Sequence, residues 1–209
     1  MHSSSGGVFS ILAEQTIKQG GVVFGARFDE NWEVKHDYTE TIDGVSVFRG
    51  SKYVQSKTGD TFKQAEQFLK QNRKVLFSGT PCQIVALKRY LKKEYENLLL
   101  VDFICHGVPS PGVWRKYLKQ VIALTCDKNT VSSHLKLLLS ERNALVEGIS
   151  FRDKRLGWQK YSFSLTLSTT DESGNKNTVS LSESLNENLF MRGFLANLYL
   201  RPSCYACPA

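Results

Sequence analysis

Residues 74–111 read KVLFSGTPCQIVALKRYLKKEYENLLLVDFICHGVPSP, and this stretch decides the fold class. Short apolar runs at 74–79 and 98–104 predict two strands, and residues 80–95 between them have helical spacing. A second helical segment follows at 112–124. Short apolar strands that alternate with helices are typical of βαβ units with a parallel sheet. We therefore expect an α/β core.

The residues before this stretch predict further elements of the same core. Residues 3–21 begin with Ser and Gly, continue with near-helical apolar spacing and end on two glycines, which predicts a capped helix. Apolar residues 22–28 predict a strand, and residues 34–40 predict its partner across a turn. A polar connection at 48–60 leads into a predicted helix at 61–72.

Beyond residue 130 the pattern changes. Residues 146–153, 160–169 and 177–184 predict antiparallel strands, with a glycine-bearing turn at 171–176. A final predicted helix near 186–200 leads to the terminal cysteines. The expected fold is thus an α/β parallel core with an added antiparallel strand region.

Composition narrows the class of protein. The chain has 209 residues, 41% of them apolar and 22% charged, which is ordinary for a globular protein. It has neither an apolar run of the roughly 20 residues that span a bilayer nor the pattern of a signal peptide, so we expect no membrane span and a cytoplasmic protein. The net charge of +7 favours anionic partners, but no nucleic-acid-binding motif accompanies it, and we expect no nucleic acid.

Two cysteines are expected to meet at one edge of the sheet. Thr80 and Pro81 suit the start of a helix, which puts Cys82 in its first turn, where the helix dipole favours a thiolate. Cys105 follows the next predicted strand. If the two strands are parallel neighbours, both cysteines emerge at the carboxyl edge, where open α/β sheets bind ligands.

The chain ends with a Cys-x-x-Cys pair, Cys204 and Cys207. Together with Cys82 and Cys105 it would form four thiolates, a set that suits a 4Fe-4S cluster or a structural zinc ion. A thioredoxin-like disulfide is disfavoured because the pair follows a helical stretch instead of opening a helix after a strand. The fifth cysteine, Cys126, is interpreted as a small buried apolar residue.

Five ordered motifs, SSGGVFS, RGSKYVQS, LFSGTPCQI, DFICHGVPS and CYACP, resemble the beta-subunit family of coenzyme F-420 hydrogenases and dehydrogenases. This family consists of iron-sulfur flavoproteins and includes formate dehydrogenase beta subunits. The resemblance implies a family N-terminal region at 1–58 and the first part of the C-terminal region at 59–209, expected as one structural unit. It assigns the cluster to Cys82, Cys105, Cys204 and Cys207.

The resemblance also implies FAD bound along a glycine-rich start and a second glycine-bearing segment, namely Ser5, Gly6, Gly7, Gly50, Ser51, Lys52 and Tyr53. A glycine-rich helix start lets backbone amides approach a phosphate, and Lys52 adds a cation. Thr80 and Gln83 are candidates to face the flavin, with helix capping as their alternative role.

The implied function is electron transfer between FAD and a 4Fe-4S cluster. Hydride would be exchanged with a deazaflavin coenzyme or another small substrate, and a ferredoxin or partner redox subunit would take single electrons. No catalytic residue is assigned. Two alternatives stay open, a zinc-binding interaction module and a nucleic-acid-binding protein with incidental cysteines. Relatives continue beyond the last Cys-x-x-Cys, so we expect a fragment or a site completed by another polypeptide, and this chain alone could be inactive.

Overall fold

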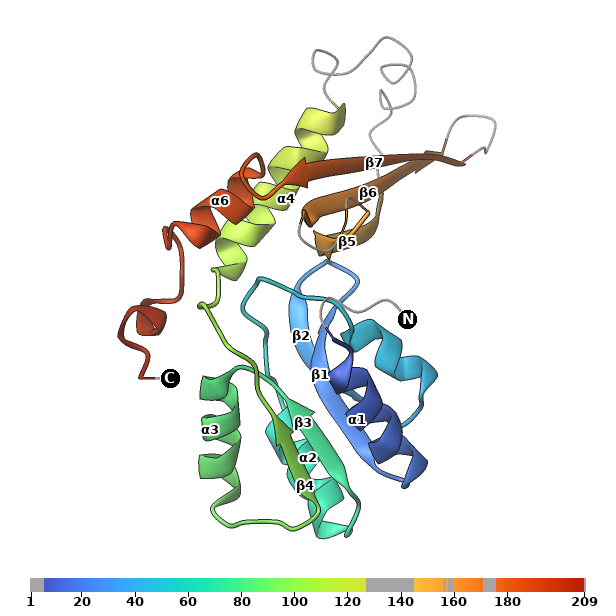
Figure 1. The fold of residues 1–209 in the computed structure, drawn as a ribbon, viewed down its shortest axis with the longest axis vertical. Coiled ribbons are helices and arrows are strands. Elements are labelled where there is room, and N and C mark those ends of the chain that lie inside the picture. Colours follow the sequence, from blue (N-terminus) through green and yellow to red (C-terminus); the bar gives the residue numbers. More distant parts are fainter. Residues whose placement is uncertain (1–5, 127–144, 156, 158–159, 171–175, 209) are drawn as a thin grey trace. The chain divides into compact units, whose positions relative to one another are not determined.

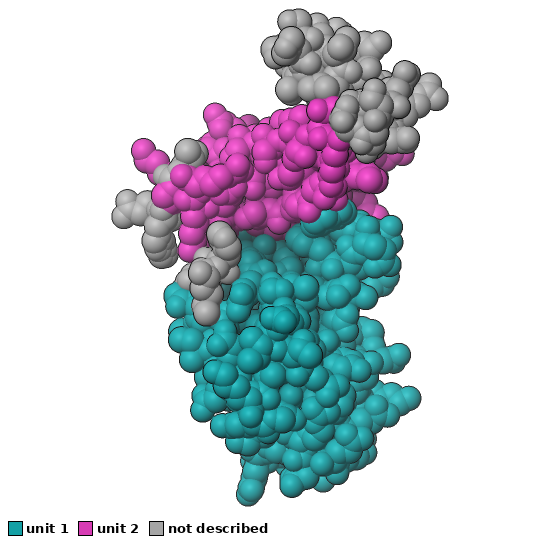
Figure 2. Space-filling view, turned by 90° about the vertical axis from the view of Figure 1, so that its right-hand side faces the viewer, with its two compact units in different colours: residues 1–108, 201–209 teal, residues 109–200 magenta. Residues whose placement is uncertain are grey.

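The computed structural model describes residues 6–126, 145–155, 157, 160–170 and 176–208. The chain divides into two compact units, each treated by itself below (Figure 2). Unit 1 comprises residues 1–108 and 201–209, and unit 2 comprises residues 109–200.

Unit 1 is built on a four-stranded sheet with the order β2-β1-β3-β4 (Figure 1). Strands β1, β3 and β4 run parallel, and β2 pairs with β1 in the antiparallel direction. The strands are β1 (Val22–Phe28), β2 (Val34–Thr39), β3 (Val75–Ser78) and β4 (Leu98–Val101). Its helices are α1 (Val8–Lys18), η1 (Asp43–Phe48), α2 (Thr61–Lys70), α3 (Pro81–Leu91) and η2 (Pro202–Ala206).

Alternating side chains of β1 and β3 fill two cores, one on each face of the sheet. Helices α2 and α3 cover one face, and α1 with η1 covers the other (Figure 1). The first core contains Val22, Phe24, Ala65, Leu69, Val75, Phe77, Ile84, Leu87 and Leu91. The second contains Ala13, Val23, Val45, Phe48 and Leu76. The predicted βαβ core is therefore confirmed.

Unit 2 contains a three-stranded antiparallel sheet in the order β5-β6-β7 and two helices. Its elements are α4 (Pro111–Cys126), β5 (Leu145–Asp153), β6 (Ser162–Thr170), β7 (Lys176–Ser184) and α6 (Leu189–Leu195). Trp114 of α4 is buried against Phe151, Phe163 and Phe190. The antiparallel addition is thus confirmed, and α4, which the sequence placed with the parallel portion, packs with it.

Two element boundaries differ from the predictions. The strand expected at 98–104 ends at Val101, because β3 ends at Ser78 and leaves residues 102–104 without a strand to pair with. The last predicted helix is shorter than expected, and η2 follows it. No helix in the described ranges is long and apolar enough to cross a membrane.

Candidate functional site

Cys82 lies in the first turn of α3, where Thr80 and Gln83 form a capping box and Pro81 occupies the start of the helix. Proline suits this position because the first helical N–H has no partner within the helix. The box keeps the first turn ordered, and it therefore holds the Cys82 side chain in a defined place.

Cys105 lies in the loop after β4. Strands β3 and β4 pair in parallel, with Ser78 opposite Val101, and the backbone N–H of Gly79 donates to the carbonyl of Val101. The start of α3 and the loop after β4 therefore leave the sheet at the same edge. The convergence of Cys82 and Cys105 that the sequence predicted is found in the structure.

Cys204 lies within η2 and Cys207 directly after it. The backbone N–H of Arg201 donates to the carbonyl of Val108 across 2.9 Å, which fastens this last segment beside the loop that carries Cys105. The backbone N–H of Cys204 in turn donates to the carbonyl of Arg201 at 2.8 Å.

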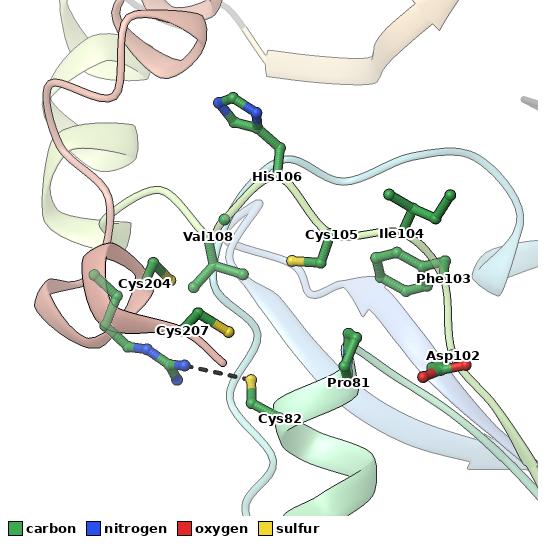
Figure 3. A pocket seen from close by; sticks show the side chains of 12 residues that line it. Pro81, Cys82, Asp102, Phe103, Ile104, Cys105, His106, Val108, Cys204 and Cys207 are labelled. Carbon is green, nitrogen blue, oxygen red and sulfur yellow. Dashed lines mark hydrogen bonds between the residues drawn. The ribbon is translucent and has the colours of Figure 1, made fainter. Parts of the chain in front are cut away.

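All four cysteines line one cavity of about 580 Å³ within unit 1 (Figure 3). None of the four forms a disulfide. The other lining residues are Pro81, Asp102, Phe103, Ile104, His106, Gly107, Val108 and Arg201. The imidazole of His106 points away from the sulfurs in Figure 3. Three chain segments thus bring four thiols to one place.

A single metal ion and a 4Fe-4S cluster need different arrangements of four thiolates. A single zinc ion needs four ligands at about 2.0–2.3 Å from one centre. No three His, Cys, Asp or Glu side chains of the described residues are grouped closely enough to hold one ion. In a 4Fe-4S cluster each of the four thiolates binds a different iron, so the sulfurs stand farther apart. Four thiols on one cavity are the number and type of donors that a 4Fe-4S cluster uses.

The two sheet-edge cysteines differ in electrostatics. Burial opposes ionisation of Cys82, but hydrogen bonds from Thr80 and Arg201 and the Arg201 charge outweigh burial, so the pKa of this thiol is lowered. Burial raises the pKa of Cys105, a hydrogen bond with the Gly107 backbone opposes this, and the other three cysteines raise the pKa further. The four thiols therefore interact electrostatically, and a cationic group that binds them would relieve their repulsion.

A chain of hydrogen bonds leads away from the Cys82 sulfur. The Thr80 hydroxyl oxygen lies 3.1 Å from that sulfur and 3.1 Å from Oε1 of Gln83. A hydroxyl has one proton, so it donates to only one of the two at a time. Oε1 of Gln83 also accepts from the Thr80 backbone N–H at 3.0 Å, which keeps Gln83 in place in either case.

The same chain continues to a buried histidine. Nε2 of Gln83 donates to the Ser56 hydroxyl at 2.9 Å, and this hydroxyl lies 2.9 Å from Nδ1 of His36. Nε2 of His36 lies 3.0 Å from the carbonyl of Ser78, which can only accept, so Nε2 carries the proton and Nδ1 accepts from Ser56. His36 and Ser56 were missed by the sequence analysis, because neither has a spacing that signals a role.

A second cavity of about 210 Å³ adjoins the same cysteine. Cys82, Val108 and Arg201 line both cavities. The remaining lining residues of the second are Gln55, Ser56, Thr58, Phe62, Thr80, Gln83 and Ala86. Thr80 and Gln83 thus serve as capping residues and also face a cavity, so both roles that the sequence left open are compatible with their positions.

The two glycine-bearing segments lie side by side. Gly7 and Gly50 have φ values of +83° and +82°, a conformation that favours glycine. Nε of Arg49 donates to the Ser10 hydroxyl at 3.1 Å, and its guanidinium lies 3.5 Å from the Glu14 carboxylate. This links the segment around Gly50 to the first turns of α1. Gly6 is exposed, whereas Ser5 lies outside the described residues.

Lys52 has a structural role that the sequence did not predict. Its ammonium donates to the carbonyls of Phe48, Arg49 and Gly50, at 3.3, 2.9 and 3.1 Å. The first carbonyl belongs to the last residue of η1, and the other two follow directly after that helix. Burial lowers the pKa of Lys52 to about 8. The lysine remains mainly protonated at pH 7 and can supply all three bonds. Its neighbours Ser51 and Tyr53 are half-buried.

Part of the chain matches a known protein family. Residues 72–209 match the family described as the C terminus of the coenzyme F420 hydrogenase/dehydrogenase beta subunit. This matched region contains all four cysteines of the cavity. No curated protein matches the chain.

A solved structure shares the fold. It is a chain of the F420-reducing NiFe hydrogenase complex from Methanosarcina barkeri, with 18% sequence identity and a TM-score of 0.52. The match covers 98% of this chain and 60% of that one. This chain therefore spans less than two thirds of the length of the solved relative.

Proposed function

Because the chain belongs to the family of coenzyme F420 hydrogenase and dehydrogenase beta subunits, we propose that it is an iron-sulfur flavoprotein that transfers electrons between FAD and one 4Fe-4S cluster. The observation that carries the proposal is the convergence of four thiols from three segments on one cavity. The family itself supports a redox role.

Cys82, Cys105, Cys204 and Cys207 would each supply one thiolate to the cluster. When bound, the cluster would exchange single electrons and the flavin would link them to hydride transfer. The chain's own residues hold the ligands in place. The capping box orders the turn of Cys82, and the bond between Arg201 and Val108 holds the terminal segment beside Cys105.

The flavin would lie along the segments that begin at Gly6 and Gly50 and extend towards Thr80 and Gln83. Three observations support this course. The two glycine-bearing segments are joined through a hydrogen bond of Arg49. Each segment contains a glycine at positive φ. Thr80 and Gln83 line a cavity that adjoins Cys82. Lys52 would act there chiefly by holding the backbone of its segment.

The hydride partner would be a deazaflavin coenzyme or another small substrate, and the one-electron partner a ferredoxin or a redox subunit. The net charge of +7 supports an acidic protein partner. Four thiols without a disulfide suit the reducing cytoplasm as the place of action.

The test is anaerobic reduction of the purified protein, followed by absorbance for the flavin and by electron paramagnetic resonance for the cluster. Reduced deazaflavin coenzyme should bleach the flavin, and a reduced-cluster signal should follow. Dithionite serves as the control reductant. A protein that binds flavin and iron but gives no cluster signal with either reductant would contradict the proposed electron transfer.

A further inference from the structure

We propose that Arg201 is a positioning residue of the cysteine site, which joins its three segments and raises the reduction potential of the cluster that they would hold. This inference rests on the function proposed above. It concerns a residue that neither the sequence motifs nor the comparisons single out.

The backbone of Arg201 joins two of the three segments. Its N–H donates to the carbonyl of Val108, three residues after Cys105, and its carbonyl accepts from the N–H of Cys204. These two bonds, at 2.9 and 2.8 Å, fix the start of η2 against the loop that follows β4. They do not depend on the identity of the side chain, so a substitution of Arg201 leaves them available.

The side chain reaches the third segment. Nη2 donates to Sγ of Cys82 across 3.3 Å, drawn as the dashed line in Figure 3. The guanidinium also interacts with the thiol of Cys204. A single cation thus lies beside two of the four sulfurs, which come from α3 and from η2.

The guanidinium keeps a further donor. Nε of Arg201 is buried and has no hydrogen-bond partner in the described part of the chain. Arg201 lines both cavities that adjoin Cys82.

A fixed cation here has a definite redox effect. Reduction adds one negative charge to the cluster and its thiolates, and a nearby positive charge stabilises the reduced state more than the oxidised one. Hydrogen bonds to ligand sulfurs act in the same direction. Arginine stays protonated at all relevant pH values, so the effect persists across the working range. Lysine would supply the charge without the planar fork of donors.

The test compares Arg201→Gln, Arg201→Lys and Arg89→Gln after anaerobic purification of the full chain. Arg89 is an exposed residue in the last turn of α3, the same helix that carries Cys82, so its substitution is a control with an equal change of charge. The readouts are iron and sulfide per chain and the midpoint potential from a redox titration followed by electron paramagnetic resonance.

We expect Arg201→Gln to lower the potential by about 59 mV or more, the equivalent of a tenfold change in a one-electron equilibrium. Arg201→Lys should restore part of the shift, and Arg89→Gln should match the wild type. If Arg201→Gln loses its iron, retention in Arg201→Lys supports the role of the charge. Equal loss in both variants, or a potential in Arg201→Gln equal to that of Arg89→Gln, would overturn the inference.

The same experiment distinguishes a failure of the proposed cluster from a failure of the role of Arg201. A wild-type protein and an Arg89→Gln protein that both lack iron would contradict the cluster itself, and the role of Arg201 with it. A wild type with a cluster and an unshifted Arg201→Gln contradicts the role of Arg201 alone.

Discussion

The side-chain amide of Gln83 donates to the hydroxyl of Ser56 across 2.9 Å. This bond ties the first turn of α3 to the connection that precedes α2, and it leaves the amide oxygen of Gln83 to accept from Thr80. Gln83 therefore joins the turn that carries Cys82 to the part of the core around His36.

Replacing Gln83 with Leu should destabilise unit 1. The backbone N–H of Thr80 and the hydroxyl of Ser56 each lose a partner, and an unsatisfied buried polar group costs about 1–3 kcal/mol. The measurement is chemical denaturation followed by far-ultraviolet circular dichroism. Gln67→Leu, at an exposed position of α2, is the matched control and should change the free energy of unfolding little. Equal stability of the two variants would show that the network around Gln83 is not stabilising.

The buried His36 predicts a pH-dependent stability. Burial lowers the pKa of His36 below its ordinary value of 6.5, although the bond with the Ser78 carbonyl opposes this. Below about pH 6.5 the unfolded chain therefore protonates His36 while the folded chain still holds it neutral. The free energy of unfolding should fall as pH drops below 6.5, by at most about 1.4 kcal/mol for each pH unit from this residue.

The measurement is denaturation of wild type and His36→Gln at pH 7.5 and pH 5.5. The variant should lose less stability between the two values than the wild type does. A His36→Gln protein with the wild-type pH dependence would contradict the buried neutral state of His36.

Lys52→Met should destabilise the end of η1. Three carbonyls, those of Phe48, Arg49 and Gly50, lose their common donor. We expect a loss of about 1–3 kcal/mol in the free energy of unfolding. Lys57→Met is the control, because the Lys57 side chain is 81% exposed and its ion pair with Glu33 spans 3.9 Å. An effect no larger than that of the control would argue against the structural role of Lys52.

Gly50→Ala tests the flavin segment. Gly50 and Gly59 both have positive φ, at +82° and +51°, and open space where a Cβ would be placed, so alanine at either position is opposed by the backbone and not by a neighbouring atom. Only Gly50 lies in the segment proposed to contact FAD. We expect Gly50→Ala to lower the FAD content of the purified protein several-fold, measured by fluorescence after heat release, while Gly59→Ala retains it. Equal FAD content in the two variants would remove Gly50 from the flavin site.

The sequence could predict the meeting of Cys82 and Cys105, because the carboxyl ends of neighbouring parallel strands necessarily lie at one edge of the sheet. It could not predict the contact of Arg201 with Cys82, which joins residues 119 positions apart in the sequence. The hydrogen bonds of His36 depend equally on the register of β2 against the rest of the sheet. Lys52 was predicted as a partner for phosphate, and no local pattern indicated that three nearby carbonyls would take its hydrogen bonds.

The central claim is that four cysteines share one cluster, and metal analysis of cysteine variants tests it most directly. Wild type, Cys82→Ser, Cys204→Ser and Cys126→Ser are purified without oxygen and analysed for iron, sulfide and zinc. We expect about four irons per chain in wild type and in Cys126→Ser, with broad visible absorbance, and loss of iron in the other two variants. Zinc without iron, or iron unchanged in Cys82→Ser, would contradict the shared cluster.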